Sequence, residues 1–291
     1  MSAYLGIDAG GTNVRAALWD GDGEPRPLGK RPLPANYEEF LALISAFAQE
    51  SGREPPTLAI ALPARLHSGM VEWAPNIPYL NGKDLAGDVV RLTGVREARL
   101  AIDGQLALLG EARFGAAQGE RNVLLVSIGT GVGGAIMCAG RLLHGEHGTA
   151  GAFGWLPSGG PDLRRRGSWE EVASGSALKE RAGELGIAPE RLADCARQGD
   201  TRAQTVLDEF AEHTGAGLAG LASAFDVGAI VIGGGVSQLV HQLLSPVQAA
   251  FERYASPTVR ATRLLIARHS DMAGAFGAAV YAREGAEVFL Q

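Results

Sequence analysis

Three glycine-rich turns in this 291-residue sequence could bring backbone N–H groups close to phosphate oxygens. They read Asp8-Ala9-Gly10-Gly11-Thr12-Asn13, Gly129-Thr130-Gly131-Val132-Gly133-Gly134 and Gly233-Gly234-Gly235. Because glycine has no side chain, a turn built from it lets an anion approach the backbone closely. Tight turns without a ligand would explain any one of them, but three such turns, the first opened by an aspartate, favour phosphate binding. None is a Walker loop, and none is a dinucleotide-binding Gly-x-Gly-x-x-Gly that opens a helix.

Two aspartates accompany these turns. Asp8 opens the first glycine turn, where the alternative is an aspartate that only caps the turn. Asp103 follows the apolar run Leu100–Ile102 and precedes an expected helix over 105–114. A strand-to-helix junction is a frequent place for functional side chains in α/β proteins, and it is also where an aspartate serves as a helix N-cap.

Strands that alternate with helices must position these residues, which predicts an α/β fold. Residues 4–19 and 123–140 each run as apolar strand, Gly-Thr turn and apolar strand, and an offset of 118 residues places Gly11-Thr12 on Gly129-Thr130. This weak internal duplication indicates two related lobes, 1–117 and 118–291, with a hinge near 115–122 and the C-terminal helix as a possible addition to the first lobe. Apolar spacing predicts further elements: helices over 38–49, 205–225, 237–254 and from 273, and strands over 57–62 and 229–232.

The composition excludes several classes of protein. Hydrophobic residues make up 46% and charged residues 20% of a chain with net charge −6, which disfavours both disorder and nucleic-acid binding. The only cysteines, Cys138 and Cys195, stand alone, so neither a disulfide framework nor a cysteine-based zinc site is expected. No secretory leader and no membrane span of about 20 apolar residues is evident, and we expect a cytoplasmic protein.

Four segments together resemble the ROK family of sugar kinases within the actin-like ATPase superfamily: LGIDAGGTNVRAAL, VSIGTGVGGAI, RLLHGEHGTAGAFGW and VIGGGVS, in that order along nearly the whole chain. The resemblance implies a two-lobed actin-like ATPase (ribonuclease H-like) fold with a central cleft. It also implies ATP- and Mg²⁺-dependent transfer of the γ-phosphate to a hydroxyl of a hexose, an aminosugar or a related molecule, and a possible homodimer.

The resemblance also assigns roles to residues. Asp8 resembles the carboxylate that helps to hold Mg²⁺, and Asp103 the general base that accepts the proton of the sugar hydroxyl. Asn76 and Glu170 resemble sugar contacts. Three glycine turns resemble the nucleotide site: Gly10, Gly11, Thr12 and Asn13 as the first phosphate loop, Gly129, Thr130 and Gly131 as the second, and Gly233, Gly234 and Gly235 as the turn at the adenosine.

The sequence departs from the family pattern mainly on the acceptor side. The usual Glu-x-Gly-His reads Ala152-Phe153-Gly154-Trp155, and the cysteine-rich zinc loop is replaced by GGPDLRRRGSWEE, so we expect no zinc site. Trp155 either stacks on a sugar face or fills the space left by Ala152. Two other functions stay open: a non-catalytic sugar or nucleotide sensor of the same fold, and a nucleotide hydrolase or phosphotransferase with a non-sugar acceptor.

Overall fold

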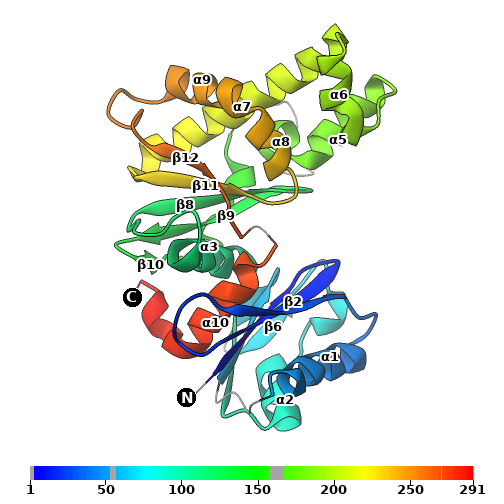
Figure 1. The fold of residues 1–291 in the computed structure, drawn as a ribbon, viewed down its shortest axis with the longest axis vertical. Helices are drawn as coiled ribbons and strands as arrows, with labels where there is room; N and C mark the ends of the chain where they lie inside the picture. Colours follow the sequence, from blue (N-terminus) through cyan, green and yellow to red (C-terminus); the bar gives the residue numbers. More distant parts are fainter. Residues whose placement is uncertain (1–2, 53–56, 68, 158–166, 270, 291) are drawn as a thin grey trace. The chain divides into compact units, whose positions relative to one another are not determined.

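The computed structural model describes residues 3–52, 57–67, 69–157, 167–269 and 271–290 as a mixed α/β protein. The chain forms two compact units (Figure 1). The first unit holds Met1–Gly119, Ile136–Ala150 and Arg268–Gln291, and the second holds Glu120–Ala135 and Gly151–Ala267. The first unit therefore includes the C-terminal helix and also residues 136–150. No helix in the described part of the chain is both long and apolar enough to cross a membrane.

Two five-stranded sheets repeat the same order of strands, which agrees with the duplication read from the sequence. The order is β3-β2-β1-β4-β7 in one sheet and β10-β9-β8-β11-β12 in the other. The strand that comes first in the chain, β1 or β8, is therefore the central strand of its sheet. In the first sheet β1 pairs in parallel with β4, and β4 with β7; in the second sheet β8 pairs in parallel with β11, and β11 with β12. The strands of the first sheet are β1 (Tyr4–Ala9), β2 (Asn13–Trp19), β3 (Arg26–Pro32), β4 (Thr57–Leu62) and β7 (Glu97–Ile102). Those of the second sheet are β8 (Val123–Ile128), β9 (Val132–Cys138), β10 (Arg141–Leu142), β11 (Ala229–Gly233) and β12 (Arg263–Ile266), and β5 (Arg65–His67) and β6 (Met70–Trp73) form a separate hairpin.

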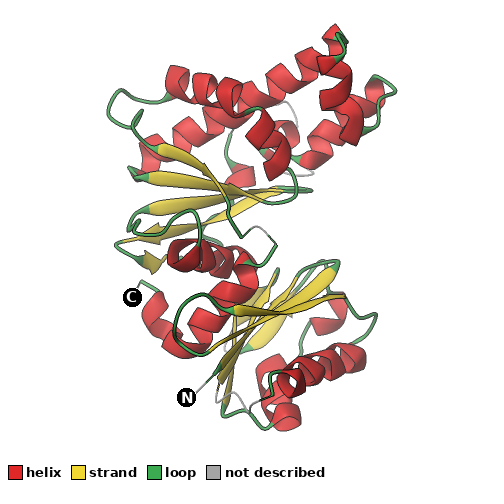
Figure 2. Ribbon diagram, viewed as in Figure 1, coloured by secondary structure: helices red, strands yellow, loops and turns green. Residues whose placement is uncertain are grey.

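Helices cover the sheets (Figure 2). The first unit contains α1 (Tyr37–Glu50), α2 (Leu85–Thr93), α3 (Asp103–Phe114) and α10 (Ala273–Glu284), with the short 3₁₀ helices η1 (Pro78–Leu80) and η4 (Gly285–Val288). The second unit contains α4 (Glu170–Ala173), α5 (Gly175–Glu184), α6 (Leu192–Arg197), α7 (Thr201–Phe225), α8 (Ser237–Gln242) and α9 (Leu244–Tyr254), with η2 (Phe153–Trp155) and η3 (Pro189–Arg191).

The two faces of strand β1 pack against different helices, one against α1 and the other against α10. Leu5 and Ile7 belong to the apolar core that contains Phe40 and Ile44 of α1. Because side chains alternate along a strand, Gly6 and Asp8 face the opposite side, where α10 lies. A Cβ at Gly6 would stand 2.1 Å from the carbonyl oxygen of Ala275 in α10, so only glycine allows this approach.

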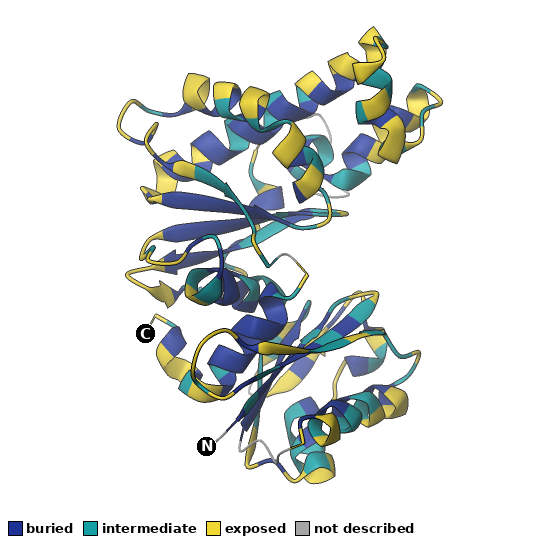
Figure 3. Ribbon diagram, in the orientation of Figure 1, coloured by how far each residue is buried: buried dark blue, intermediate teal, exposed yellow. Residues whose placement is uncertain are grey.

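The same close packing joins α3 to α10. A Cβ at Gly110 would lie 2.2 Å from the carbonyl oxygen of Ala273, and one at Gly277 would lie 1.7 Å from that of Leu106. Nine of the 12 residues of α10 are accordingly buried (Figure 3). Gly6, Gly110 and Gly277 therefore serve backbone-to-backbone packing around α10 and not turns.

Two details of the expected helices are wrong. Helix α3 begins at Asp103, two residues earlier than expected, and Ile102 holds the N-cap position. The helix expected over 237–254 is two helices, α8 and α9, which meet at Leu243. Pro246 in the first turn of α9 has no N–H to donate to the carbonyl of Gln242, so a single continuous helix would lack a hydrogen bond there.

Candidate functional site

Asp8 and Asp103 lie at the same edge of the first sheet. Asp8 is paired in register with Ala61 of β4, and Leu62 is paired with Ile102, the residue just before Asp103. Strands β1, β4 and β7 run parallel, so their carboxyl ends meet at one edge, where the ligand sites of open α/β sheets are found. The structure thus brings together the two carboxylates that the sequence singled out.

The surroundings of both carboxylates disfavour their charged forms. Burial raises the pKa of Asp8 to about 7, with a further increase from the charge of Asp103 and an opposing effect from the Arg15 guanidinium. Burial also raises the pKa of Asp103, while backbone hydrogen bonds lower it, including the 2.7 Å bond that its Oδ1 accepts from the N–H of Gly104. That bond goes to the adjacent residue and Asp103 is the first residue of α3, so the N-cap reading of Asp103 is wrong. Perturbed carboxylates gathered at a strand edge are typical of catalytic sites.

The first glycine turn is the tip of the β1–β2 hairpin. The N–H of Gly10 donates to the carbonyl of Asn13 at 3.0 Å, and the carbonyl of Thr12 accepts from Leu33 at 2.9 Å. A Cβ at Gly11 would lie 3.3 Å from the Cβ of Asn76, so the structure places Asn76 beside this turn.

The second glycine turn is held from several sides within the second unit. The N–H groups of Gly175 and Ser176, at the start of α5, donate to the carbonyls of Gly129 and Thr130 at 2.7 and 3.3 Å. Oε2 of Glu170 accepts from the N–H of Val132 at 2.9 Å. The turn is therefore fixed at both ends, and Glu170 is directly attached to it.

The third glycine turn lies beside the second. The N–H of Val236 donates to the carbonyl of Ile128 at 2.9 Å, and a Cβ at Gly129 would be 3.9 Å from the backbone nitrogen of Gly235. Gly234 has a φ of +85°, and a Cβ there would stand 2.5 Å from the carbonyl oxygen of Ile128. Glycine is thus required at this position both by conformation and by space.

Trp155 does not fill the space left by Ala152. The residue ends η2 and is 65% exposed, so the packing interpretation is wrong. Its neighbour Gly154 is packed against Glu170, since a Cβ there would lie 3.1 Å from Oε2 of that glutamate. The residue before Trp155 in the chain thus packs against the glutamate that supports the second glycine turn. Residues 158–166, which replace most of the family's zinc loop, lie outside the described residues.

Arg15 is a candidate site residue that sequence reasoning missed. It is paired in register with Asp8 across the β1–β2 hairpin, which puts both side chains on the same face of the sheet. Its Nη2 contacts Oδ1 of Asp271 at 3.3 Å, just before α10. A hairpin whose centre lies between Gly11 and Thr12 sets Arg15 opposite Asp8, and this register is known only from the structure.

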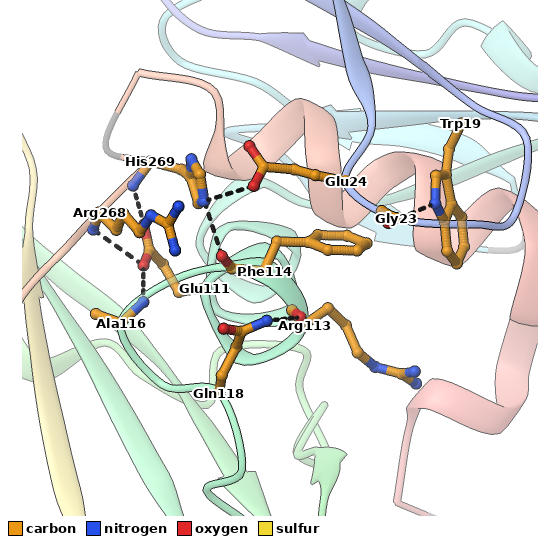
Figure 4. Close-up of polar contacts among 10 residues, drawn as sticks. All are labelled: Trp19, Gly23, Glu24, Glu111, Arg113, Phe114, Ala116, Gln118, Arg268 and His269. Carbon is orange, nitrogen blue, oxygen red and sulfur yellow. Dashed lines mark hydrogen bonds and ion pairs between the residues drawn. The ribbon is translucent and has the colours of Figure 1, made fainter.

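Glu111 is a second missed residue, and it fixes the chain just ahead of α10. Its fully buried carboxylate accepts backbone hydrogen bonds from Ala116 at 2.8 Å, Arg268 at 3.1 Å and His269 at 2.6 Å (Figure 4). The ring nitrogen Nε2 of His269 also lies 2.9 Å from the carbonyl oxygen of Phe114. A buried carboxylate among three N–H donors is satisfied without a cation, so Glu111 serves to hold the segment that leads to α10.

The residues present fit a phosphate ester and a Mg²⁺ ion. At Gly10 a Cβ would meet only the carbonyl oxygen of Asn13, at 3.5 Å, and at Gly133 and Gly235 no heavy atom lies within 4 Å of the added Cβ, so the backbone at these positions is open to a phosphate. Within the ranges that the structure describes, no group of three or more histidine, cysteine or acidic side chains could hold a metal by itself. Mg²⁺ commonly takes one or two carboxylates and completes its shell with water and substrate phosphates. Asp8 is suited to that role, with Asp103 nearby.

Comparison with known proteins places these features in a family context. Residues 4–285 match the family described as ROK family. A glucokinase of Streptomyces coelicolor is 30% identical, with 98% of each chain covered.

Solved structures show the same likeness. A ROK family glucokinase from Streptomyces griseus, crystallised in complex with glucose and AMPPNP, is 31% identical and superposes with a TM-score of 0.81 over 98% of this chain and 100% of that one. A ROK hexokinase from Thermus thermophilus is 30% identical, with a TM-score of 0.83 over 98% and 99% of the two chains. The two-lobed actin-like ATPase fold expected from the sequence is confirmed.

Proposed function

Because the chain belongs to the ROK family, we propose that it is an ATP-dependent kinase that transfers the γ-phosphate to a hydroxyl group of a hexose or a related sugar. The observation that carries this proposal is the pair Asp8 and Asp103 at one strand edge, with the first glycine turn beside them. One carboxylate is available for Mg²⁺ and the other for a hydroxyl proton.

Asp103 is the proposed general base. A sugar hydroxyl is a weak nucleophile at neutral pH, and a carboxylate within hydrogen-bond distance orients it and accepts its proton. In the transfer, the sugar oxygen forms a bond to the γ-phosphorus, the bond from that phosphorus to the bridging oxygen breaks, and ADP leaves. The hydroxyl proton passes to Asp103. The raised pKa of Asp103 makes it a stronger base than an ordinary aspartate.

The remaining roles are those that the family resemblance implies for the glycine turns. In the first unit, Gly10, Gly11, Thr12 and Asn13 would bind phosphate oxygens, and Asp8 would hold Mg²⁺, which neutralises charge on the phosphates when bound. In the second unit, Gly129, Thr130 and Gly131 would bind phosphates and Gly233, Gly234 and Gly235 would approach the adenosine.

The acceptor contacts are proposed to be Asn76, Glu170 and Trp155. Asn76 lies beside Gly11, which supports a position near the transferred phosphate. Glu170 contacts the second glycine turn. The exposed indole of Trp155 is free to stack on the apolar face of a pyranose, as aromatic side chains do with ligands that have one apolar face.

The test is an ADP-release assay with ATP, Mg²⁺ and a panel of hexoses and aminosugars, run beside a no-sugar control. Sugar-dependent ADP release with at least one member would support the kinase. Nucleotide binding without turnover on any sugar would instead identify the non-catalytic sensor. Equal ADP release with and without sugar would identify a nucleotide hydrolase.

A further inference from the structure

Arg15 carries more hydrogen-bonding capacity than its observed partner uses. Its side chain is only 16% exposed, and its Nε is buried without a hydrogen-bond partner in the described part of the chain. Among the described residues its ion-pair partner is Asp271, through a single 3.3 Å contact from Nη2, and the Asp271 side chain is 71% exposed and also contacts Lys30 at 3.4 Å. Because the Asp271 carboxylate is exposed and shared with Lys30, this contact contributes little stability.

Burying the Nε–H of a guanidinium without an acceptor is unfavourable, so the arrangement calls for a further acceptor beside Asp271. Arginine offers five N–H donors in a planar fork that matches two oxygens of a phosphate. Arg15 faces the same side of the hairpin as Asp8, the residue proposed to hold Mg²⁺, and its charge reaches that carboxylate. The terminal phosphate of a nucleotide is the acceptor that would come to this place.

We propose that Arg15 is a catalytic residue that donates hydrogen bonds to the γ-phosphate of ATP and stabilises the negative charge on it during transfer. This inference rests on the proposed kinase function. The competing explanation is that Arg15 only pairs with Asp271 and thereby fixes the start of α10.

The test compares Arg15→Gln and Arg15→Lys with Asp271→Asn, which removes the charge of the ion-pair partner and leaves Arg15 in place. Calorimetry measures the affinity of each protein for ADP and for the non-hydrolysable analogue AMPPNP, both with Mg²⁺. For Arg15→Gln we expect about 10–100-fold weaker binding of the analogue, because a charge-assisted hydrogen bond is lost, and less than about threefold change for ADP, which has no γ-phosphate. The kcat should fall by about 10²–10³-fold, as when one preorganised donor to a developing charge is removed.

The conservative variant separates charge from geometry. Arg15→Lys keeps the cation but loses the planar fork, so its kcat should lie between those of the wild type and Arg15→Gln. Asp271→Asn should stay within about threefold of the wild type in both measurements. Thermal unfolding of each variant shows whether it is folded, and if Arg15→Gln is not, Arg15→Lys carries the test through its weaker binding of the analogue.

Two results would overturn the proposal: unchanged affinity of the folded Arg15 variants for the analogue, or an equal loss in Asp271→Asn. A failure of the kinase function gives a different pattern. In that case no sugar would produce ADP release in the wild type, whereas the preference for the analogue over ADP would still depend on Arg15.

Discussion

The carboxylate of Glu170 is bound to the second glycine turn, through the 2.9 Å hydrogen bond that its Oε2 accepts from the N–H of Val132. The neighbouring Gly131 has no side chain, and a Cβ there would collide with the same oxygen. Family resemblance suggested a sugar contact for Glu170. The geometry adds a second task, because the same side chain supports a turn that we propose binds phosphate.

Substitutions at Glu170 should separate these two tasks. Glu170→Gln keeps an oxygen that accepts from Val132 but loses the charge, so we expect the KM for sugar to rise about tenfold or more with little change in the KM for ATP. Glu170→Ala loses both interactions and should raise both KM values. Steady-state kinetics with each substrate varied in turn measures the split, and a Gln variant in which only the KM for ATP rises would contradict the sugar contact.

The sequence was sufficient for the parts of the site that follow from strand ends and glycine turns. Both hairpins, and the positions of Asp8 and Asp103 at the ends of strands, follow from apolar runs that stop at polar residues, whereas their shared edge comes from the strand pairing. Arg15 and Glu111 were missed because the partners of a charged residue inside an apolar element cannot be identified from the sequence. For Arg15 they depend on the strand register, and for Glu111 on how α3 packs. The exposure of Trp155 likewise depends on neighbours distant in the sequence.

Asp103→Asn should lower kcat by about 10²–10⁴-fold if this residue is the general base. The base must be ionised to accept a proton, so kcat/KM of the wild type should fall as the pH decreases through the pKa of Asp103. Burial raises that pKa, so the acid limb should lie at higher pH than for an ordinary aspartate. Rate profiles against pH for both proteins provide the measurement. Full activity of the Asn variant would remove Asp103 from the mechanism.

Asp8 should make the ligand-free protein less stable at alkaline pH. Its pKa is about 7 in the folded protein against an ordinary value of 3.8, so between these values the folded state binds a proton that the unfolded state does not. Stability contributed by this proton is present at low pH and is lost as the pH rises through 7. We expect Asp8→Asn to raise Tm by a few degrees at pH 8 and by less at pH 5, since about 1 kcal/mol corresponds to about 2–4 °C in a protein of this size.

Thermal unfolding at the two pH values, without nucleotide or Mg²⁺, checks the effect of Asp8→Asn. The exposed Asp208 on α7 supplies the matched control, and Asp208→Asn should shift Tm equally at both pH values. A Tm difference for Asp8→Asn that does not depend on pH would argue against a raised pKa.

Glu111→Gln should destabilise the fold by about 1–3 kcal/mol. In the wild type, both carboxylate oxygens accept hydrogen bonds from backbone N–H groups. The glutamine amide keeps one of these oxygens but replaces the other with an NH₂ group, which cannot accept. At least one buried N–H donor is then left without a partner. Urea unfolding measures the loss, with the exposed Glu190→Gln as the control that should change stability by less than about 0.5 kcal/mol. Equal stability of the two variants would show that the three hydrogen bonds do not hold the segment before α10.

Two glycine-to-alanine substitutions in helices should act in opposite directions. At Gly277 in α10, a Cβ would lie 1.7 Å from the carbonyl oxygen of Leu106, and backbone atoms cannot give way as a flexible side chain does. Gly277→Ala should therefore cost at least about 1–3 kcal/mol, the usual cost of overpacking. At Gly220 in α7 no heavy atom lies within 4 Å of the added Cβ, so Gly220→Ala should stabilise by about 0.5–1 kcal/mol through helix propensity alone. Tm and soluble yield report both effects. A Gly277→Ala protein that unfolds at the wild-type temperature would mean that α3 and α10 do not cross as closely as the glycines at positions 110 and 277 permit.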